Sequence, residues 1–186
     1  MVKKIAISGN IASGKSQVEK ILLDLGFNVY DSDKIAHDVL NDITEFYNYD
    51  VFTEGKIDRK KLGAIVFSNP DIKLKLEKLT HPKIKENILK IFEENKDNNY
   101  VFVSVPLLYE AGFENIFDKV IFISVNEDIQ LKRLMNRNNF TREEALLRIN
   151  SQQQQSEKIE RANFVIENNK TIDELKIAVE QVINLL

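Results

Sequence analysis

The hydrophobic residues of the chain gather in short runs that predict buried strands, with helical repeats between them. Five such runs are predicted strands, and those at residues 4–8, 100–105 and 120–125 lack strict apolar–polar alternation, which is typical of parallel strands covered on both faces. The five runs comprise residues 4–8, 27–30, 100–105, 120–125 and 164–166. Short buried strands separated by helices predict a three-layer α/β domain with a five-stranded parallel sheet.

The ends of two helices are marked by the residues found there. Val18 and Leu22 belong to a helical repeat, and Gly26 stands where such a helix would end in a left-handed cap. The last helix of the chain is predicted to open with a capping box formed by Thr171 and Glu174.

Residues 34–96 form a segment of a different kind, predicted to contain no strand and to fold into several helices. The expected helices cover residues 34–40, 60–67, 72–79 and 83–94. Asn69-Pro70 and His81-Pro82 are expected to separate them, because the residue before proline disfavours helical geometry.

A second predicted helical segment is strongly polar and spans residues 127–161. Thr141 and Glu144 match a capping box and indicate that a new helix begins there. Gln152 to Gln155 are expected on a helix surface. The predicted domains are therefore a core of residues 1–33, 97–126 and 162–186, a helical insertion of residues 34–96, and a lid of residues 127–161.

Residues 9–16 read Gly-Asn-Ile-Ala-Ser-Gly-Lys-Ser and match the phosphate-binding loop G-x-x-x-x-G-K-[ST]. Glycines let successive backbone N–H groups turn inward, and the following helix directs its positive end at the same anion. Lys15 would reach the β- and γ-phosphates of a nucleotide, and the hydroxyl of Ser16 would bind Mg²⁺. The motif follows a predicted buried strand and opens a predicted helix, as this chemistry requires.

The loop alone leaves GTPases, ATPase motors and small-molecule kinases open. No aspartate is followed by glycine three places later, and Asn169-Lys170-Thr171-Ile172 lacks the aspartate of a guanine-binding motif. A motor should carry a strand that ends in aspartate, whereas residues 101–105 run into Pro106. These absences favour a kinase over a nucleotide-dependent switch protein, which stays the alternative from another class.

Asp31-Ser32-Asp33 directly follows the second predicted strand, at the edge of the sheet where α/β proteins collect their ligands. Two carboxylates there could orient an acceptor hydroxyl and take its proton. Asp31 or Ser32 could equally cap the next helix. Both readings stay open at this point.

Basic residues occur in two regions that suit an anionic substrate. Arg133 and Arg137 share a helix face in the predicted lid, and Arg142 and Arg148 follow. Arginines on a mobile lid can close over ATP, although most arginines of this kind lie on a solvated face. Residues 56–90 also carry an excess of basic residues, which would attract an anion unless it is ordinary surface lysine.

Composition excludes several other classes of protein. The formal net charge is -3, which does not indicate binding to nucleic acid or anionic membranes. Cysteine is absent, so disulfides, thiolate metal sites and a cysteine nucleophile are excluded. No apolar run is long enough to span a membrane, and the N-terminal residues lead directly into a strand pattern. A cytoplasmic protein is expected.

The ordered motifs resemble the dephospho-coenzyme A kinase family over nearly the whole chain. The matching stretches are residues 7–16, Asp31-Ser32-Asp33 with Ala36, Asp58-Arg59, Leu62-Gly63, Val66-Phe67, Leu76-Glu77, His81-Pro82, Val105-Pro106-Leu107-Leu108-Tyr109-Glu110, Gln130, Arg133-Leu134, Arg137, Arg148-Ile149, Ser151-Gln152, Ala162 and Val165-Ile166-x-Asn168. The phosphate-binding loop is common to many families, whereas the D-x-D, H-P and P-L-L-x-E sequences in this order are much more specific.

The resemblance implies transfer of phosphate from ATP, with Mg²⁺, to the ribose 3′-hydroxyl of dephospho-CoA, which gives coenzyme A. It implies catalytic roles for Asp33, Lys15 and Arg137, and a metal-binding role for Ser16. The implied ATP-binding residues are Gly9, Ile11, Ala12, Ser13, Gly14, Lys15, Ser16, Gln17 and Arg137. The implied substrate-binding residues are Asp31, Asp33, His81, Leu108 and Glu110. A nucleoside or nucleoside-monophosphate kinase is the alternative within the same class, and a monomer or weak homo-oligomer is expected.

Three positions in or beside the loop depart from the family pattern. Asn10 and Ala12 replace glycines, and Gln17 replaces the usual threonine. The two glycines of the motif, Gly9 and Gly14, are retained. These departures should affect loop geometry and nucleotide affinity rather than phosphate binding as such.

Overall fold

The computed structural model describes residues 1–41, 51–53 and 56–186. The chain divides into two compact units, which are described separately. The core unit contains Met1–Asp31 and Phe92–Leu186, and the inserted unit contains Ser32–Ile91. None of the described helices is both long and apolar enough to cross a membrane.

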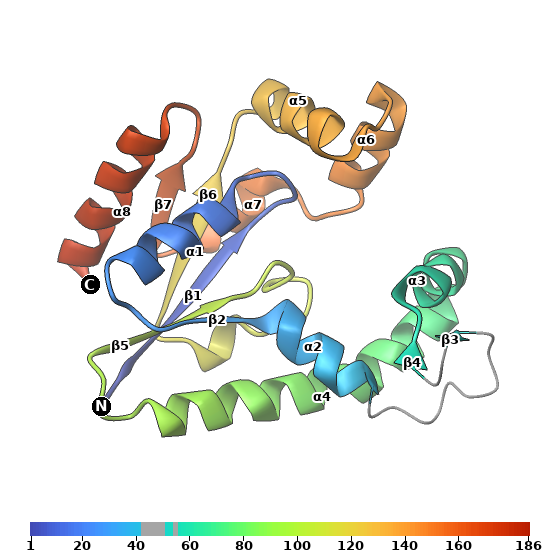
Figure 1. Ribbon diagram of the computed structural model, residues 1–186, viewed down its shortest axis with the longest axis horizontal. Coiled ribbons are helices and arrows are strands. Elements are labelled where there is room, and N and C mark those ends of the chain that lie inside the picture. The colour runs from blue at the N-terminus through green and yellow to red at the C-terminus, as the bar shows by residue number, and fades with distance from the viewer. Residues whose placement is uncertain (42–50, 54–55) are drawn as a thin grey trace. The chain divides into compact units, whose positions relative to one another are not determined.

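A five-stranded parallel sheet lies at the centre of the core unit and confirms the predicted α/β fold (Figure 1). Its strand order is β2-β5-β1-β6-β7. The strands are β1 (Lys3–Gly9), β2 (Val29–Asp31), β5 (Tyr100–Ser104), β6 (Lys119–Ser124) and β7 (Phe164–Glu167). With β1 in the middle, the loop that follows Gly9 lies at the carboxyl edge of the sheet between two neighbouring strands.

Helices α1 (Lys15–Asp24) and α8 (Ile172–Leu185) pack side by side against one face of this sheet (Figure 1). Their buried residues join those of the strands in a single core. This core contains Ile5, Ile7, Val18, Ile21, Leu22, Phe102, Ile121, Ile123, Ile166, Leu175 and Val179. A short 3₁₀ helix, η1 (Glu114–Ile116), precedes β6.

The end of α1 has the predicted left-handed glycine cap. Gly26 has a φ of +86°, and its N–H donates to the carbonyl of Leu23 at 2.9 Å. The N–H of Phe27 donates to the carbonyl of Leu22 at 3.0 Å. This hydrogen-bond pattern is a Schellman motif, which satisfies the last carbonyls of the helix before the chain enters β2.

The polar segment after β6 folds into α5 (Glu127–Asn138), α6 (Arg142–Asn150) and α7 (Gln155–Arg161). The capping boxes predicted at Thr141 and Thr171 are both present. Helices α5 and α6 share a small core around Leu131, Leu134 and Ala145. The expectation for Gln152 to Gln155 was wrong, because residues 152–154 connect α6 to α7 and only Gln155 is helical.

The inserted unit contains two short strands that the sequence pattern did not predict. Its elements are α2 (Ser32–Asn41), β3 (Phe52–Thr53), β4 (Lys56–Ile57), α3 (Arg59–Ser68) and most of α4 (Pro70–Glu94). Strands β3 and β4 pair antiparallel through Phe52–Ile57 and Thr53–Lys56. Strands of two residues are too short to show alternation, so a segment without strands was the wrong prediction.

The predicted break at Pro82 was also wrong, because α4 continues through it. Buried residues recur at Thr80, Ile84 and Ile88, and thus form one stripe that crosses the proline. Burial of such a stripe can outweigh the roughly 3 kcal/mol that a proline costs inside a helix. Pro70, in contrast, is the first residue of the helix, where proline is tolerated because that N–H has no helical partner.

Candidate active site

Residues 9–16 connect β1 directly to α1, as a phosphate-binding loop requires. The N–H of Ser13 donates to the carbonyl of Asn10 at 3.0 Å and turns the chain. Gly14 has a φ of +88° and is the N-cap of α1, where no side chain of the described residues makes a capping hydrogen bond. The first N–H groups of α1 therefore stay available to an anion at the positive end of the helix.

Both glycines of the motif occupy places where a side chain would collide with its neighbours. A Cβ atom on Gly9 would lie 2.5 Å from Oγ of Ser13 and 2.9 Å from the carbonyl oxygen of Ile123. A Cβ atom on Gly14 would lie 2.0 Å from Nδ2 of Asn168. This amide of Asn168 donates to the carbonyl of Ser13 at 2.8 Å, so it anchors the loop from the end of β7.

Ala12 is the loop residue with the least favourable backbone. Its φ is +60°, in the left-handed region that costs a residue with a Cβ atom about 1–2 kcal/mol. We expect Ala12→Gly to raise the free energy of unfolding by about 1 kcal/mol, as measured by chemical denaturation. Ala36→Gly, within α2, is the matched control and should lower it by a similar amount. Destabilisation by both substitutions would contradict backbone strain at Ala12.

Side chains from the polar helical segment hold the first half of the loop. The amide of Gln130, on α5, donates to the carbonyl of Ile11 at 2.8 Å. Oε1 of Gln152 accepts the N–H of Ile11 at 2.7 Å. The amide of Asn10 donates to the carbonyl of Gln153 at 3.2 Å. These contacts link the loop to α5 and to the connection between α6 and α7.

A completely buried lysine completes this link. Nζ of Lys158, on α7, donates to Oδ1 of Asn10 at 2.8 Å and to Oε1 of Glu110 at 2.6 Å. The side chain of Glu110 is 22% exposed. If either residue of this ion pair were removed, water could therefore only partly take its place beside the other. Asn10 thus has a specific partner that a glycine at this position could not bind.

Removing this lysine should destabilise the core unit. We expect Lys158→Ala to lower the free energy of unfolding by about 2–4 kcal/mol, because it leaves a poorly hydrated carboxylate without its cation. The matched control is Lys170→Ala, which breaks an ion pair to Glu174 whose lysine is 74% exposed. That control should unfold at nearly the wild-type denaturant concentration. Equal losses for the two variants would contradict the importance of burial at Lys158.

Lys15 is held in a three-residue cluster at the carboxyl edge of the sheet. Its Nζ lies 2.7 Å from Oε1 of Glu19, one turn later on α1, and also contacts Oγ of Ser104. Ser104 is the buried last residue of β5, and its hydroxyl donates to the same Glu19 oxygen. The side chains of Lys15 and Glu19 are 16% and 19% exposed, so this ion pair is shielded from bulk water.

The aspartates of the D-x-D sequence lie where β2 gives way to α2. Asp31 is the last residue of β2 and is the register partner of Ser104 on β5. This places Asp31 on the same edge of the core unit as the phosphate-binding loop. Asp33 follows two residues later, exposed in the first turn of α2.

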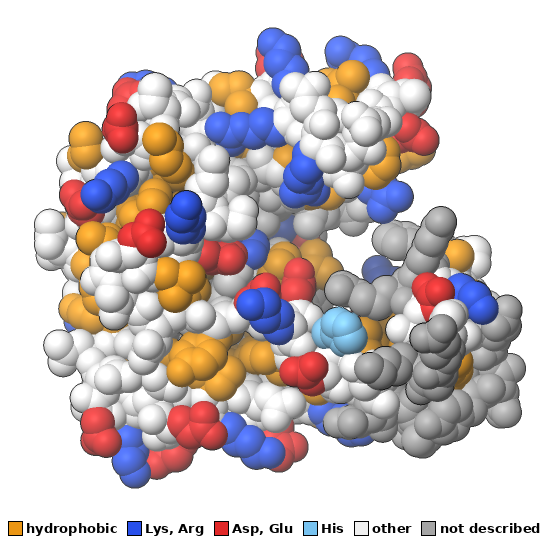
Figure 2. Space-filling view, viewed as in Figure 1, with side chains coloured by type: hydrophobic (Ala, Val, Ile, Leu, Met, Phe, Trp, Pro, Cys, Tyr) orange, Lys and Arg blue, Asp and Glu red, His pale blue; other side chains and the backbone are white. Residues whose placement is uncertain are grey.

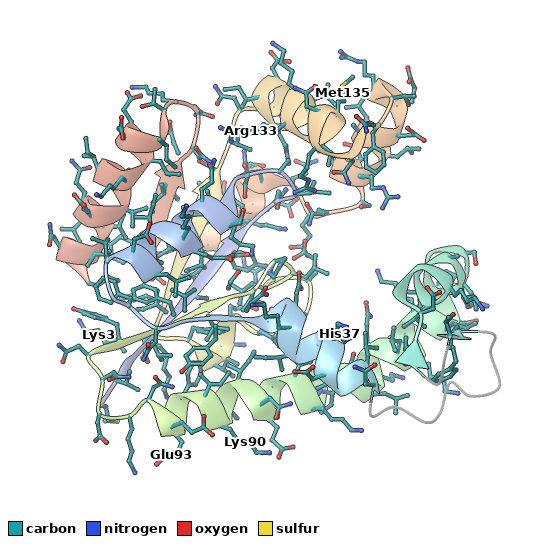
Figure 3. All side chains as sticks on the ribbon, in the orientation of Figure 1. Lys3, His37, Lys90, Glu93, Arg133 and Met135 are labelled. Atoms are coloured by element: carbon teal, nitrogen blue, oxygen red, sulfur yellow. The ribbon has the colours of Figure 1, made fainter. Side chains whose placement is uncertain are left out.

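The basic residues of the predicted lid differ in their surroundings. Lys and Arg side chains gather over α5 and α6 (Figure 2). Arg137 is exposed, and its Nε donates to Asn138 at 2.9 Å. Arg133 extends from α5 on the side nearer α1 (Figure 3). Its Nη1 is buried without a hydrogen-bond partner in the described part of the chain. Arg133 therefore offers the more shielded donor for an anion.

Two further predicted site residues lie at partly or fully buried positions. His81 lies in α4, where burial lowers the pKa of its imidazole and the nearby carboxylate of Glu77 partly opposes that change. A lower pKa favours neutral imidazole near pH 7. Leu108 is completely buried after β5, so its side chain does not lie on an open surface.

The dephospho-CoA kinase family model matches residues 3–174. This range includes the phosphate-binding loop, the D-x-D sequence, the H-P pair and the polar helical segment. The chain belongs to this family. A dephospho-CoA kinase of Carboxydothermus hydrogenoformans is 39% identical over 192 residues, which cover 98% of this chain and 92% of that protein. A dephospho-CoA kinase of Geobacillus kaustophilus is 40% identical over 95% of this chain and 92% of its own length.

Solved structures agree with this family assignment. A dephospho-CoA kinase from Campylobacter jejuni is 36% identical, with a TM-score of 0.76 over 99% of this chain and 96% of its own. A Thermus thermophilus structure is 30% identical, with a TM-score of 0.87 over 100% of this chain and 98% of its own. A shikimate kinase from Aquifex aeolicus, at 18% identity and a TM-score of 0.55, shares the fold.

Several residues that shape the site of this dephospho-CoA kinase family member were not singled out from the sequence. Glu19 could have been noticed, because it stands four places after Lys15 on a predicted helix. Gln152 and Asn168 were part of the family resemblance, but nothing local indicated that they bind the loop. Lys158 gave no signal, because a lysine in a polar segment is usually exposed.

Proposed function

We propose that the protein transfers the γ-phosphate of ATP to the ribose 3′-hydroxyl of dephospho-CoA, which yields ADP and coenzyme A. The observation that carries this proposal is the match to the dephospho-CoA kinase family over residues 3–174, because it covers the acceptor-side motifs as well as the phosphate-binding loop. In the reaction, a bond forms between the 3′-oxygen and the γ-phosphorus. The bond from that phosphorus to the β–γ bridging oxygen breaks, and the hydroxyl proton is released.

The loop of residues 9–16 would hold the triphosphate of ATP. The N–H groups of Gly14, Lys15 and Ser16 would stabilise negative charge without having to reorganise during transfer. Ile11, Ala12 and Gln17 shape the loop around them. Lys15 would leave Glu19 and contact the β- and γ-phosphates, because charge on these oxygens grows as the bridging bond breaks.

Ser16 would bind the Mg²⁺ that accompanies ATP. Ser16 lies in the first turn of α1, three residues before Glu19 on the same helix. Hydroxyl and carboxylate oxygens are the ligands that Mg²⁺ prefers, so the residues present fit this ion. When bound, Mg²⁺ would offset part of the negative charge of the triphosphate.

Asp33 would orient the acceptor hydroxyl and accept its proton, as the acidic residue does in other phosphotransferases. Asp31, at the end of β2, would fix the position of this turn and contact the substrate. Substrate-binding roles are also proposed for His81 and Glu110, whereas the completely buried side chain of Leu108 would support the site from the core. Glu110 is already paired with Lys158, which would hold its carboxylate in a defined position.

The polar helices α5 and α6 would close over ATP as a lid. Arg137, on the exposed surface of α5, would then contact the adenine or the phosphates. Arg133 would direct its buried Nη1 at the phosphates, because a shielded donor gains most from a charged acceptor. Closure would exclude water and reduce wasteful hydrolysis of ATP.

An assay of ADP release with a panel of acceptors tests this function. We expect turnover with dephospho-CoA, and much slower release with adenosine, AMP and shikimate. Turnover only with a nucleoside or nucleoside monophosphate would reassign the protein within the kinases. Nucleotide binding without any acceptor-dependent release would favour a switch protein.

A cytoplasmic location and a monomeric or weakly homo-oligomeric state are further parts of the proposal.

A further inference from the structure

The carboxylate of Glu19 lies where the chemistry of a P-loop enzyme calls for an acidic residue. In P-loop NTPases, Mg²⁺ is held by the serine or threonine of the loop together with an aspartate from a neighbouring strand. Here β5, the strand beside β1, ends in Ser104 and continues into Val105-Pro106. This strand therefore supplies a hydroxyl at its end and no carboxylate.

Helix α1 brings a carboxylate to that same point. Oε1 of Glu19 accepts a hydrogen bond from the Ser104 hydroxyl at 2.5 Å and lies 2.7 Å from Nζ of Lys15. Glu19 is therefore in contact with the residue that occupies the end of the strand. Residues three apart on a helix are neighbours, so the carboxylate of Glu19 and the hydroxyl of Ser16 belong to one region of α1.

We propose that Glu19 is a positioning residue that replaces the aspartate missing from the end of β5. Without nucleotide, it pairs with Lys15 and keeps the lysine beside the loop. When ATP arrives with Mg²⁺, Lys15 moves to the phosphates, and Glu19 provides its negative charge, together with the Ser16 hydroxyl, for the ion. This inference rests on the proposed use of ATP and Mg²⁺, and it is independent of which acceptor receives the phosphate.

The negative charge of Glu19 should make the site prefer ATP that carries Mg²⁺ over ATP without the ion. Without the ion, its carboxylate repels the triphosphate and competes with it for Lys15. With the ion, the same carboxylate becomes favourable, because it faces a divalent cation. Because the site is partly shielded, these electrostatic effects are larger than they would be in water. Glu19 should therefore increase the ratio of the ATP dissociation constant without Mg²⁺ to that with Mg²⁺.

Calorimetric titration of ATP into the full chain, with EDTA or with excess Mg²⁺, measures this ratio without any acceptor. We expect Glu19→Gln to lower the ratio by about tenfold or more, which corresponds to about 1.4 kcal/mol of lost coupling. Part of the change should be tighter binding of ATP in EDTA. The control Asp24→Asn removes an exposed carboxylate from the same helix and should keep the wild-type ratio.

A second substitution makes the test specific to the position of the charge. Adding Ser104→Asp to Glu19→Gln returns a carboxylate to the end of β5 and should restore most of the ratio. A wild-type ratio in Glu19→Gln would overturn the inference. If that variant fails to fold, Glu19→Ala, which also removes the carboxylate, should lower the ratio in the same way, and a wild-type ratio there would also overturn it. Absence of ADP release with dephospho-CoA, in contrast, would overturn the proposed function and leave the ratio unaffected.

Discussion

Replacing Asp33 with asparagine is expected to lower kcat by about 10²–10⁴-fold and to leave the dissociation constant of ATP within about threefold of wild type. Asparagine preserves the size of the side chain and one acceptor oxygen but cannot take up the proton of the acceptor hydroxyl. The effect should therefore appear in kcat, measured by ADP release at saturating dephospho-CoA. Nucleotide binding should change little, because the loop of residues 9–16 is intact.

The alternative role of this turn is to begin α2, and stability measurements distinguish the two. Asp33 lies in the first turn of that helix, where a negative charge is favourable by a few tenths of a kcal/mol. Asp38→Asn, at an exposed position on the same helix, is the matched control and should retain wild-type turnover. Near-normal turnover of Asp33→Asn, together with a lower melting temperature, would assign Asp33 to the helix end instead.

Gly14→Ala is expected to have the second large effect, by disrupting the loop and the fold around it. The new Cβ atom would lie 2.0 Å from Nδ2 of Asn168, and the backbone would keep a φ of +88° that disfavours alanine. Asn168 is 2% exposed, so displacing it breaks buried hydrogen bonds as well. We expect a loss of about 3 kcal/mol or more in the free energy of unfolding and at least about 10²-fold weaker ATP binding.

Substitutions at two other glycines distinguish the two causes of this effect, which are strain in the backbone and the collision with Asn168. Gly26 has a φ of +86° but open space around it, so Gly26→Ala tests backbone strain alone and should cost about 1 kcal/mol. Gly63 lies in α3 with open space and no positive φ, so Gly63→Ala should be neutral or slightly stabilising. Equal losses for Gly14→Ala and Gly26→Ala would show that the contact with Asn168 is unimportant.

The departures from the family pattern have separate physical accounts. Asn10 carries a side chain that Lys158 and the connection between α6 and α7 both bind, so it makes contacts that the glycine expected at this position could not make. Ala12 has the left-handed backbone that glycine would adopt without strain. The Gln17 side chain accepts from Asn168 at 3.3 Å and so contributes to the same anchor of the loop.

Local patterns were sufficient to predict most of the core unit. Short apolar runs identified all five strands of the sheet, and the nearly continuous runs at residues 100–105 and 120–125 became β5 and β6, which are buried on both faces. Capping residues identified the starts of α6 and α8, because these side chains bind only their own helix. The same reasoning failed in the inserted unit, where β3 and β4 are too short for a pattern and α4 continues through Pro82.

The sequence by itself determined the sheet, the phosphate-binding loop and the family, because each depends on residues close together in the chain or on motifs in a fixed order. Only the tertiary structure decided which side chains support the loop. Lys158 and Asn10 are 148 positions apart, and Ser104 and Glu19 are 85 positions apart. A lysine, a serine and a glutamate of this kind look like ordinary surface residues until folding removes water from them. Once these side chains are buried, they lose most of their hydrogen bonds to water, and the contacts that they make with one another replace them.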